Sequence, residues 1–263
     1  MPGIKQPSAG IDKGSHAATN ERILRLAEPL LVRPLCILDL GCGSGYFLNK
    51  LAAFYEQRSW AIEPNLLGID IDLTHYRANQ VPAKQIDVNK ALPFDDASFD
   101  IVFAIEVFEH TRAPYLLLQD ISRILSPGGH LIMSVPNVMH ILSRLSYLLT
   151  GHFYMYPTPS ARSQNAGRLC GHIEPLPLQY WDYGLRYAGF AEIIYEIDRV
   201  KKGAIGLALL FKPLIMLASA YYEKRMRNYD QAVGDETCHL FRHVNSLRTL
   251  TARSLIFSAR KPA

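Results

Sequence analysis

Short apolar runs alternate along the chain with segments in which apolar residues recur at helical spacing. The apolar runs predict strands at residues 36–40, 66–70, 84–86, 99–104, 130–135, 191–197 and 254–259. Helices are predicted before Pro34 and at residues 46–57, 115–125, 138–150 and 178–188. Strands that are apolar nearly throughout and alternate with helices are typical of a parallel sheet covered on both faces. We therefore predict an α/β fold with a mostly parallel seven-stranded sheet, helices on both faces and a C-terminal insertion.

The ends of several predicted elements carry residues that favour helix caps. Thr19 or Asn20 is expected to cap the first helix, and Asp72 to cap a helix after the second strand. Asn137 follows the fifth strand, where it can either face a ligand pocket or cap the next helix. Residues 1–18 are polar and rich in glycine and proline, which predicts a flexible leader.

The remainder, residues 19–263, is expected to form a single domain. Its regular alternation breaks after the fifth strand. Residues 138–177 contain a long segment rich in Gly, Pro, Ser and Tyr, which is typical of a functional loop, and we interpret them as an acceptor or lid segment. Residues 200–227 are predicted to be an apolar insertion.

Composition narrows the class of protein. The hydrophobic content of 49% fits a substantial core, and the formal net charge of +4 is mild and spread, which does not favour a nucleic-acid partner. The four cysteines form no Cys-x-x-Cys pair, and the N-terminus has no apolar signal region. These features predict a cytoplasmic protein.

The most informative stretch is Ile37-Leu-Asp-Leu-Gly-Cys-Gly-Ser-Gly45, in which glycine occupies three alternating positions after an apolar strand. Glycine lets the backbone turn sharply and approach a ligand closely. A dinucleotide fingerprint would need a glycine in place of Tyr46, and a phosphate loop would need Gly-Lys-Ser/Thr. The loop therefore indicates a nucleoside ligand without phosphates, of which S-adenosylmethionine is the commonest.

Acidic residues end the first three predicted strands: Asp39, Asp70 and Asp87. An acid after the second strand can accept hydrogen bonds from both ribose hydroxyls, and one after the third from the adenine amine. The alternative is that each serves only as a turn or cap residue. Their register with the glycine loop favours the binding role.

With these motifs the chain resembles the class I S-adenosylmethionine-dependent methyltransferases, in particular the methyltransferase type 11-like subgroup that includes ubiquinone-type O-methyltransferases. The matching segments are 37–45, 68–70, Asp87, 92–94, 98–100, 106–110 and 125–129. The resemblance implies a Rossmann-like fold and S-adenosylmethionine as cofactor. It also implies that Gly41, Gly43 and Gly45 approach the methionine end, that Asp70 holds the ribose and that Asp87 with Val88 contacts adenine.

Methyl transfer to oxygen also needs a group that removes the hydroxyl proton. Glu106, Glu109 and His110 follow the fourth strand, and on a helical turn they would project from one face. The resemblance links such a Glu-x-x-Glu-His pattern to a divalent metal, but the same residues can brace a helix or line the cofactor pocket, and we assign no metal ligand. His140, His152, His172, Tyr154 and Tyr156 flank the acceptor segment and are weaker candidates.

The apolar stretch at residues 203–222 has basic residues on both sides. Lys212 and Pro213 stand at its centre, and a central lysine costs about 2.5–3.5 kcal/mol on insertion, which argues against a membrane-spanning helix. The open alternatives are contact with a membrane surface, a buried hairpin broken at Pro213, a cover over the pocket and a homodimer surface. Membrane contact would place the protein at the inner face of the membrane.

We expect an enzyme that methylates a small-molecule, lipid-linked or glycan acceptor, with a hydroxyl oxygen favoured over nitrogen or carbon. A nucleic-acid amino-methyltransferase is disfavoured because Ala104-Ile-Glu-Val107 stands where Asn/Asp-Pro-Pro-aromatic would be expected. The alternative is an inactive S-adenosylmethionine-binding partner that anchors or regulates another enzyme at a membrane.

Overall fold

The computed structural model describes residues 17–156, 158 and 172–263, so the predicted leader lies almost wholly outside the described residues. The strands are β1 (Ile37–Leu40), β2 (Leu66–Asp70), β3 (Ala83–Gln85), β4 (Phe99–Ile105), β5 (Leu125–Pro136), β6 (Ala191–Ile197) and β7 (Ser254–Arg260). The α-helices are α1 (Ala17–Ala27), α2 (Tyr46–Gln57), α3 (Pro114–Ile124), α4 (Ile141–Thr150), α6 (Leu178–Tyr187), α7 (Ile205–Tyr229), α8 (Gln231–Val244) and α9 (Leu247–Thr251). Short 3-10 turns are η1 (Glu28–Leu30), η2 (Phe108–His110) and η3 (Lys202–Ala204).

The seven strands form one sheet in the order β3-β2-β1-β4-β5-β7-β6. Neighbouring strands among β1 to β5 pair in parallel, whereas β7 runs antiparallel to both β5 and β6. The predicted mostly parallel sheet is thus confirmed. The chain order reverses between β1 and β4, and the carboxyl ends of strands at such a point are where ligands bind in open α/β sheets.

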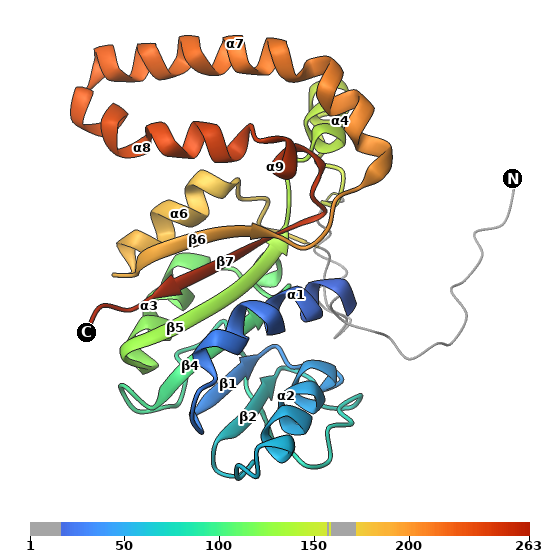
Figure 1. Cartoon of the computed structure of the whole chain (residues 1–263), viewed down its shortest axis with the longest axis vertical. Coiled ribbons are helices and arrows are strands. Elements are labelled where there is room, and N and C mark those ends of the chain that lie inside the picture. The colour runs from blue at the N-terminus through green and yellow to red at the C-terminus, as the bar shows by residue number, and fades with distance from the viewer. Residues whose placement is uncertain (1–16, 157, 159–171) are drawn as a thin grey trace, which may run out of the picture.

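Helices cover both faces of the sheet, as the apolar pattern predicts (Figure 1). On one face α1 and α2 bury side chains such as Ile23 and Leu51 against Phe103. On the other face α3, α6 and α8 pack side chains such as Trp181 against Phe257. Successive strand residues point to opposite faces, so each apolar strand supplies both cores.

Three cap predictions are wrong. No helix follows β2; instead Asp72 Oδ1 accepts the backbone N–H of Thr74 at 2.9 Å and forms a turn. Thr19 and Asn20 lie inside α1 and are buried rather than at its start.

The third wrong cap concerns Asn137, for which a cap on a helix starting at Val138 is one of two alternatives; it is wrong because α4 begins at Ile141. The imidazole Nδ1 of His140 accepts the N–H of Leu142 and caps it. Asn137 is buried and instead donates to the carbonyls of Thr249 (2.6 Å) and Ala252 (3.1 Å). It therefore ties the end of β5 to the C-terminal segment.

The predicted insertion lies between β6 and β7 and consists of α7, α8 and α9. The predicted break at Pro213 is wrong, because α7 continues through this residue and the chain reverses only at Asp230. The alternative that this stretch is buried is wrong too, because Ala208 is the only buried residue of α7. A bridge between Val200 and Ala252 closes the base of the insertion.

Candidate active site

The glycine loop joins β1 to α2, and all three glycines have a positive φ: 75° at Gly41, 50° at Gly43 and 78° at Gly45. They serve different purposes. A Cβ at Gly41 would lie 2.4 Å from Val107, and one at Gly45 would lie 2.6 Å from Ala78, so both allow close packing of the protein on itself. A Cβ at Gly43 would meet nothing within 4 Å. Only Gly43 faces open space where a ligand could approach the backbone.

Asp70, at the end of β2, reaches directly to this loop. Its Oδ2 accepts the N–H of Gly43 at 2.8 Å, and its Oδ1 accepts the N–H of Asp72 at 3.0 Å. Parallel pairing of β1 with β2 sets this approach, with Leu40 opposite Ile69. The structure thus places two of the predicted cofactor residues in contact, on the edge where a nucleoside would lie.

Asp39 is 2% exposed within β1. Burial, with a smaller contribution from the charge of Asp70, raises the pKa of its carboxyl to about 8. The carboxyl is therefore uncharged at neutral pH in the free protein. A cationic ligand nearby would favour its ionised form.

Asp87 and Val88 follow β3. Asp87 Oδ1 accepts the backbone N–H and the side-chain amide of Asn89 at 3.0 and 3.1 Å, and these hydrogen bonds outweigh burial and hold its pKa below the usual value. Val88 lines a cavity of about 250 Å³ against α3, together with Leu117. Whether either residue contacts adenine stays a prediction.

Glu106 directly follows β4 and has a φ of 55°, a left-handed conformation that is uncommon for a residue with a Cβ. Its carboxylate pairs with the guanidinium of Arg253 at 3.2 Å and accepts from the Ser134 hydroxyl at 3.4 Å. The helical turn η2 starts only at Phe108. The prediction that Glu106 shares one helical face with Glu109 and His110 is therefore wrong.

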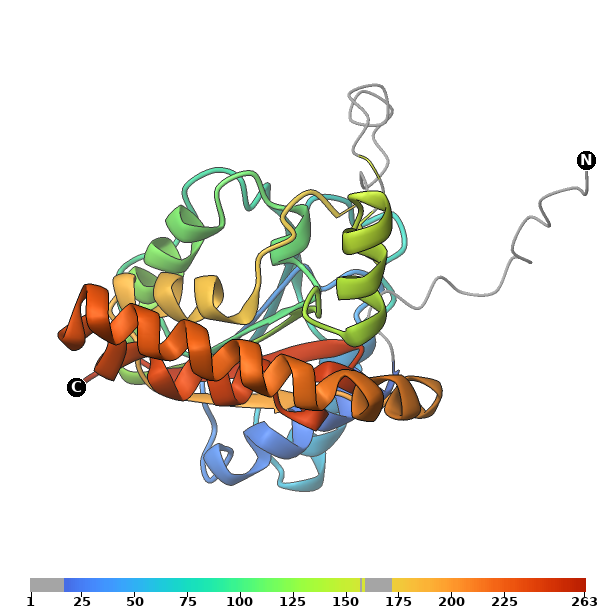
Figure 2. The ribbon, with the colours of Figure 1, turned by 90° about the horizontal axis from the view of Figure 1, so that it is seen from above.

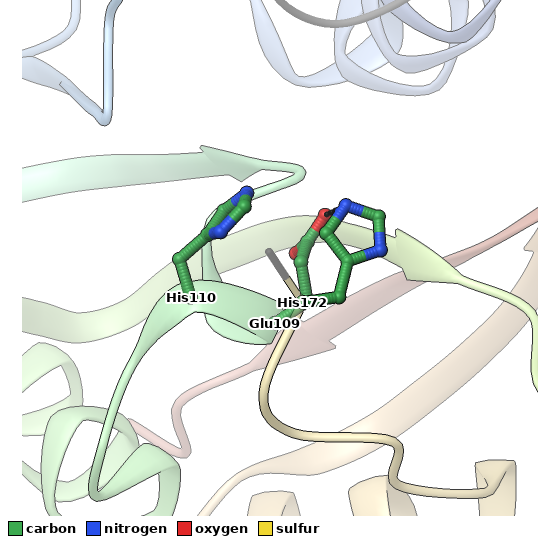
Figure 3. Close-up of side chains that lie close together, drawn as sticks. All are labelled: Glu109, His110 and His172. Atoms are coloured by element: carbon green, nitrogen blue, oxygen red, sulfur yellow. Dashed lines mark ion pairs between the residues drawn. The ribbon is translucent and has the colours of Figure 1, made fainter. Parts of the chain in front are cut away.

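Glu109 is completely buried within η2, and within the described structure neither of its carboxylate oxygens has a hydrogen-bond partner. The Nε2 of His172 lies 3.9 Å from Glu109 Oε1. Figure 3 shows the imidazoles of His110 and His172 beside this carboxyl group, with ring centroids 5.1 Å apart. The ring of Tyr156 lies 5.1 Å from that of His172. A residue from the acceptor segment is thus brought to the end of β4.

The electrostatics of this group follow from burial. Burial and the nearby charge of Glu106 raise the pKa of Glu109 well above its usual range. Burial also lowers the pKa of His172 to about 4. At neutral pH a carboxyl group with a raised pKa therefore lies beside a neutral imidazole. The Nδ1 of His172 has no hydrogen-bond partner among the residues described, and a backbone hydrogen bond with Met155 holds the ring.

The same group fits a divalent ion. One donor atom each from Glu109, His110 and His172 lies within 4.8 Å of the others. Two imidazoles and a carboxylate are typical ligands of transition metals, and a cation would satisfy the Glu109 oxygens, which no described residue contacts by a hydrogen bond. Glu106, paired with Arg253, is not part of this donor set.

The other histidine and tyrosine candidates lie elsewhere. His140 is buried as the cap of α4, and His152 is exposed with its ring nitrogens on Thr150 and Thr158. The ring of Tyr154 is exposed and lies under the ammonium of Lys201 at 4.4 Å.

Sequence reasoning missed Arg253, whose partner Glu106 is 147 positions away. The only sequence signal is a basic residue directly before an apolar strand.

Residues 38–133 match the family model described as a methyltransferase domain. Malonyl-[acyl-carrier protein] O-methyltransferase 1 of Coxiella burnetii (strain RSA 493 / Nine Mile phase I) is 27% identical over 140 residues, 53% of this chain and 47% of that protein. tRNA U34 carboxymethyltransferase of Hydrogenovibrio crunogenus (strain DSM 25203 / XCL-2) is 32% identical over 102 residues, 37% of this chain and 31% of that protein. The chain thus spans less than half the length of these two curated relatives.

The crystal structure of a SAM dependent methyltransferase from Archaeoglobus fulgidus matches with a TM-score of 0.56, covering 92% of each chain at 15% identity, which shows a shared fold. The segment matched by the family model runs from β1 into β5, the half of the sheet that carries the glycine loop and the strand-end acids. Residues 38–133 of this chain thus resemble a methyltransferase domain, and the chain shares the fold of a solved S-adenosylmethionine-dependent methyltransferase.

Proposed function

We propose that this protein transfers a methyl group from S-adenosylmethionine to a hydroxyl oxygen of a small-molecule, lipid-linked or glycan acceptor. The observation that carries the proposal is the buried Glu109–His172 pair at the carboxyl end of β4. It offers a neutral imidazole whose buried Nδ1 has no hydrogen-bond partner in the described part of the chain, on the edge of the sheet that holds the glycine loop. A nitrogen acceptor with a free lone pair would not need such a proton acceptor.

The cofactor supplies an electrophilic methyl group, so the protein mainly positions the two reactants and moves one proton. The acceptor oxygen forms a bond to the methyl carbon while the carbon–sulfur bond breaks, giving a methyl ether and S-adenosylhomocysteine. His172 Nδ1 takes the hydroxyl proton and later releases it to solvent. Glu109 lies beside the imidazole that has become charged, and its ionised form would then be favoured by the opposite charge.

The remaining residues would hold the cofactor and fix the backbone around the site. Gly43 and Asp70 would hold the nucleoside, and Asp39 would lie near the positive end of the cofactor. The Arg253–Glu106 pair fixes the end of β4 from which η2 starts. A divalent ion held by Glu109, His110 and His172 would lower the pKa of an acceptor hydroxyl, which is a second way to reach the same chemistry.

The test is release of S-adenosylhomocysteine by the purified full chain with crude lipid and glycan extracts. Acyl carrier protein and tRNA belong in the panel because two relatives carry these acceptors in their names. His172→Ala should lower kcat about 10²-fold or more with an unchanged Kd for the cofactor. His152→Ala is the matched control, since this exposed imidazole lies outside the group.

Unchanged kcat in His172→Ala would refute the assigned role of His172. Activity that disappears with a chelator and returns with a divalent ion would favour the metal route over direct proton transfer. Cofactor binding without turnover on any acceptor would support the alternative of an inactive binding partner.

A further inference from the structure

Helix α7 presents its apolar side to solvent. Leu210, Leu214, Leu217 and Tyr221 recur at intervals of four, three and four residues, so they share one face of the helix. Their exposed fractions are 71%, 63%, 71% and 68%. Leucines on a solvated helix surface of this length are unusual unless something covers them. We call these four side chains the α7 stripe.

The opposite side of α7 holds the helix to the domain. Ala208 is fully buried, and Ile215 packs beside Leu250 of α9 in a small core. Farther along, Ser219 Oγ accepts from the side-chain amide of Asn245 at 2.7 Å, and Tyr222 packs on Phe241 of α8. The helix is therefore attached along most of its length, and the stripe points away from these contacts.

Figures 1 and 2 agree on the position of α7: it lies along the outside of the molecule, with α8 on its inner side. By length and composition Lys202–Tyr229 could cross a membrane, and 11% of its most apolar window is buried. Spanning would require α7 to leave α8 and α9 and would place Lys212 in the lipid core. A helix lying flat keeps these contacts.

Positive charge gathers around the stripe. The segment from Arg199 to Tyr229 contains seven basic residues and one acid, a formal charge of +6 against +4 for the whole chain. The expectation of an evenly spread charge is therefore wrong. The single acid, Glu223, is paired with Arg227 at 3.2 Å. Basic residues stand at both ends of the stripe, with Lys202 before it and Lys224 after it.

We propose that α7 docks this protein onto an anionic phospholipid surface, with the helix parallel to the bilayer and the α7 stripe among the acyl chains. Apolar residues on one side of a helix and cations at its ends match the two properties of such a surface. A second copy of this chain fits less well, because a two-fold contact through α7 would bring one +6 segment against another. The inference does not depend on the proposed methyl transfer.

Helix α7 is connected to the candidate active site through α4. Helix α4 shares a small core with α7 through Leu145 and Phe211, and it ends in the exposed side chains of Leu148 and Leu149. The chain then continues to Tyr156, which packs against His172. The segment that carries Tyr156 and His172 is therefore connected to α7 through α4, in accord with a lipid-linked acceptor.

The test is co-sedimentation of the full chain with phosphatidylcholine vesicles, with and without phosphatidylglycerol, in the absence of cofactor and acceptor. We expect binding to the anionic vesicles that weakens with salt. Leu210→Asp with Leu217→Asp should lower this binding about tenfold or more. Val32→Asp with Leu116→Asp is the control. It adds the same two charges at apolar positions outside α7, where the side chains are 79% and 67% exposed.

All four substituted side chains are exposed, and circular dichroism of each variant checks that the fold is retained. Wild-type protein that does not sediment with anionic vesicles would overturn the proposal, as would equal loss in the α7 variant and the control. A wild-type dimer in sedimentation velocity that dissociates in the α7 variant would also overturn it in favour of self-association. Because no catalytic step is measured, failure here leaves the proposed methyl transfer standing, and the reverse also holds.

Discussion

Asp39→Asn should stabilise the cofactor-free protein, and the gain should grow with pH. In the unfolded chain Asp39 ionises near its ordinary value of 3.8, whereas in the folded protein its pKa is about 8. At a pH between about 4 and about 8 the carboxyl is ionised in the unfolded chain but protonated in the folded protein, which favours the unfolded state. Each pH unit above the ordinary value costs the folded state about 1.4 kcal/mol, so the penalty is about 4 kcal/mol near neutral pH. Below about pH 4 both states are protonated and the penalty disappears.

Asparagine has nearly the same shape and no charge, so it removes this penalty. The assay is urea unfolding of wild type and Asp39→Asn between about pH 4 and about pH 8, with the difference in unfolding free energy plotted against pH. Asp87→Asn is the control of opposite sign, because its pKa lies below the usual value and its charge therefore stabilises the fold above that range. A difference for Asp39→Asn that does not rise with pH would refute the claim that this carboxyl is buried and uncharged.

Three further predictions concern binding and packing. A bound sulfonium favours ionised Asp39, so the affinity for S-adenosylmethionine should increase from about pH 6 to about pH 8. The increase, measured by calorimetry, should be steeper than for S-adenosylhomocysteine, whose sulfur carries no charge. Equal slopes for the two ligands would contradict this. Gly43→Ala should cost about 1–2 kcal/mol of stability from its positive φ but abolish most cofactor binding, whereas Gly41→Ala should mainly destabilise the fold, since its Cβ would clash. Arg253→Met leaves Glu106 without its cation and should lower the unfolding free energy by about 2–4 kcal/mol. Adding Glu106→Gln to this variant should restore most of the loss. No recovery in the double variant would mean that the ion pair contributes little to stability.

The sheet could be predicted because its strands are apolar on both faces, and the bounds of β2 and β6 match the prediction to the residue. Asp70 could also be placed, because the carboxyl ends of neighbouring parallel strands meet at one edge. Asp72 and Asn137 could not, because their hydrogen bonds depend on where the backbone turns next. A polar residue after a strand can cap a helix, close a turn or bind a distant carbonyl, and its identity is the same in all three cases.

Tertiary contacts decide what remains. His172 reaches Glu109 from a segment with no regular pattern, and Arg253 reaches Glu106 from the far end of the chain. Periodicity shows that residues 203–222 are apolar but not which side of α7 meets the domain, since apolar residues occupy most positions there. Only the structure shows that the side with Ala208 is buried and the leucine-rich side is not.

The bridge between Val200 and Ala252 has a consequence for how this fold can change. The chain leaves the sheet and returns to it at one point, so residues can be added or removed within the excursion without shifting the register of β6 and β7. Within it, α8 and α9 fill the interior with Leu240, Val244 and Leu250, whereas α7 adds only Ala208. The exposed side of α7 is thus the part of the excursion whose composition can be altered most freely. On the proposal that α7 docks on lipid, altering that side would change the surface to which the protein binds while the residues at the end of β4 stayed the same.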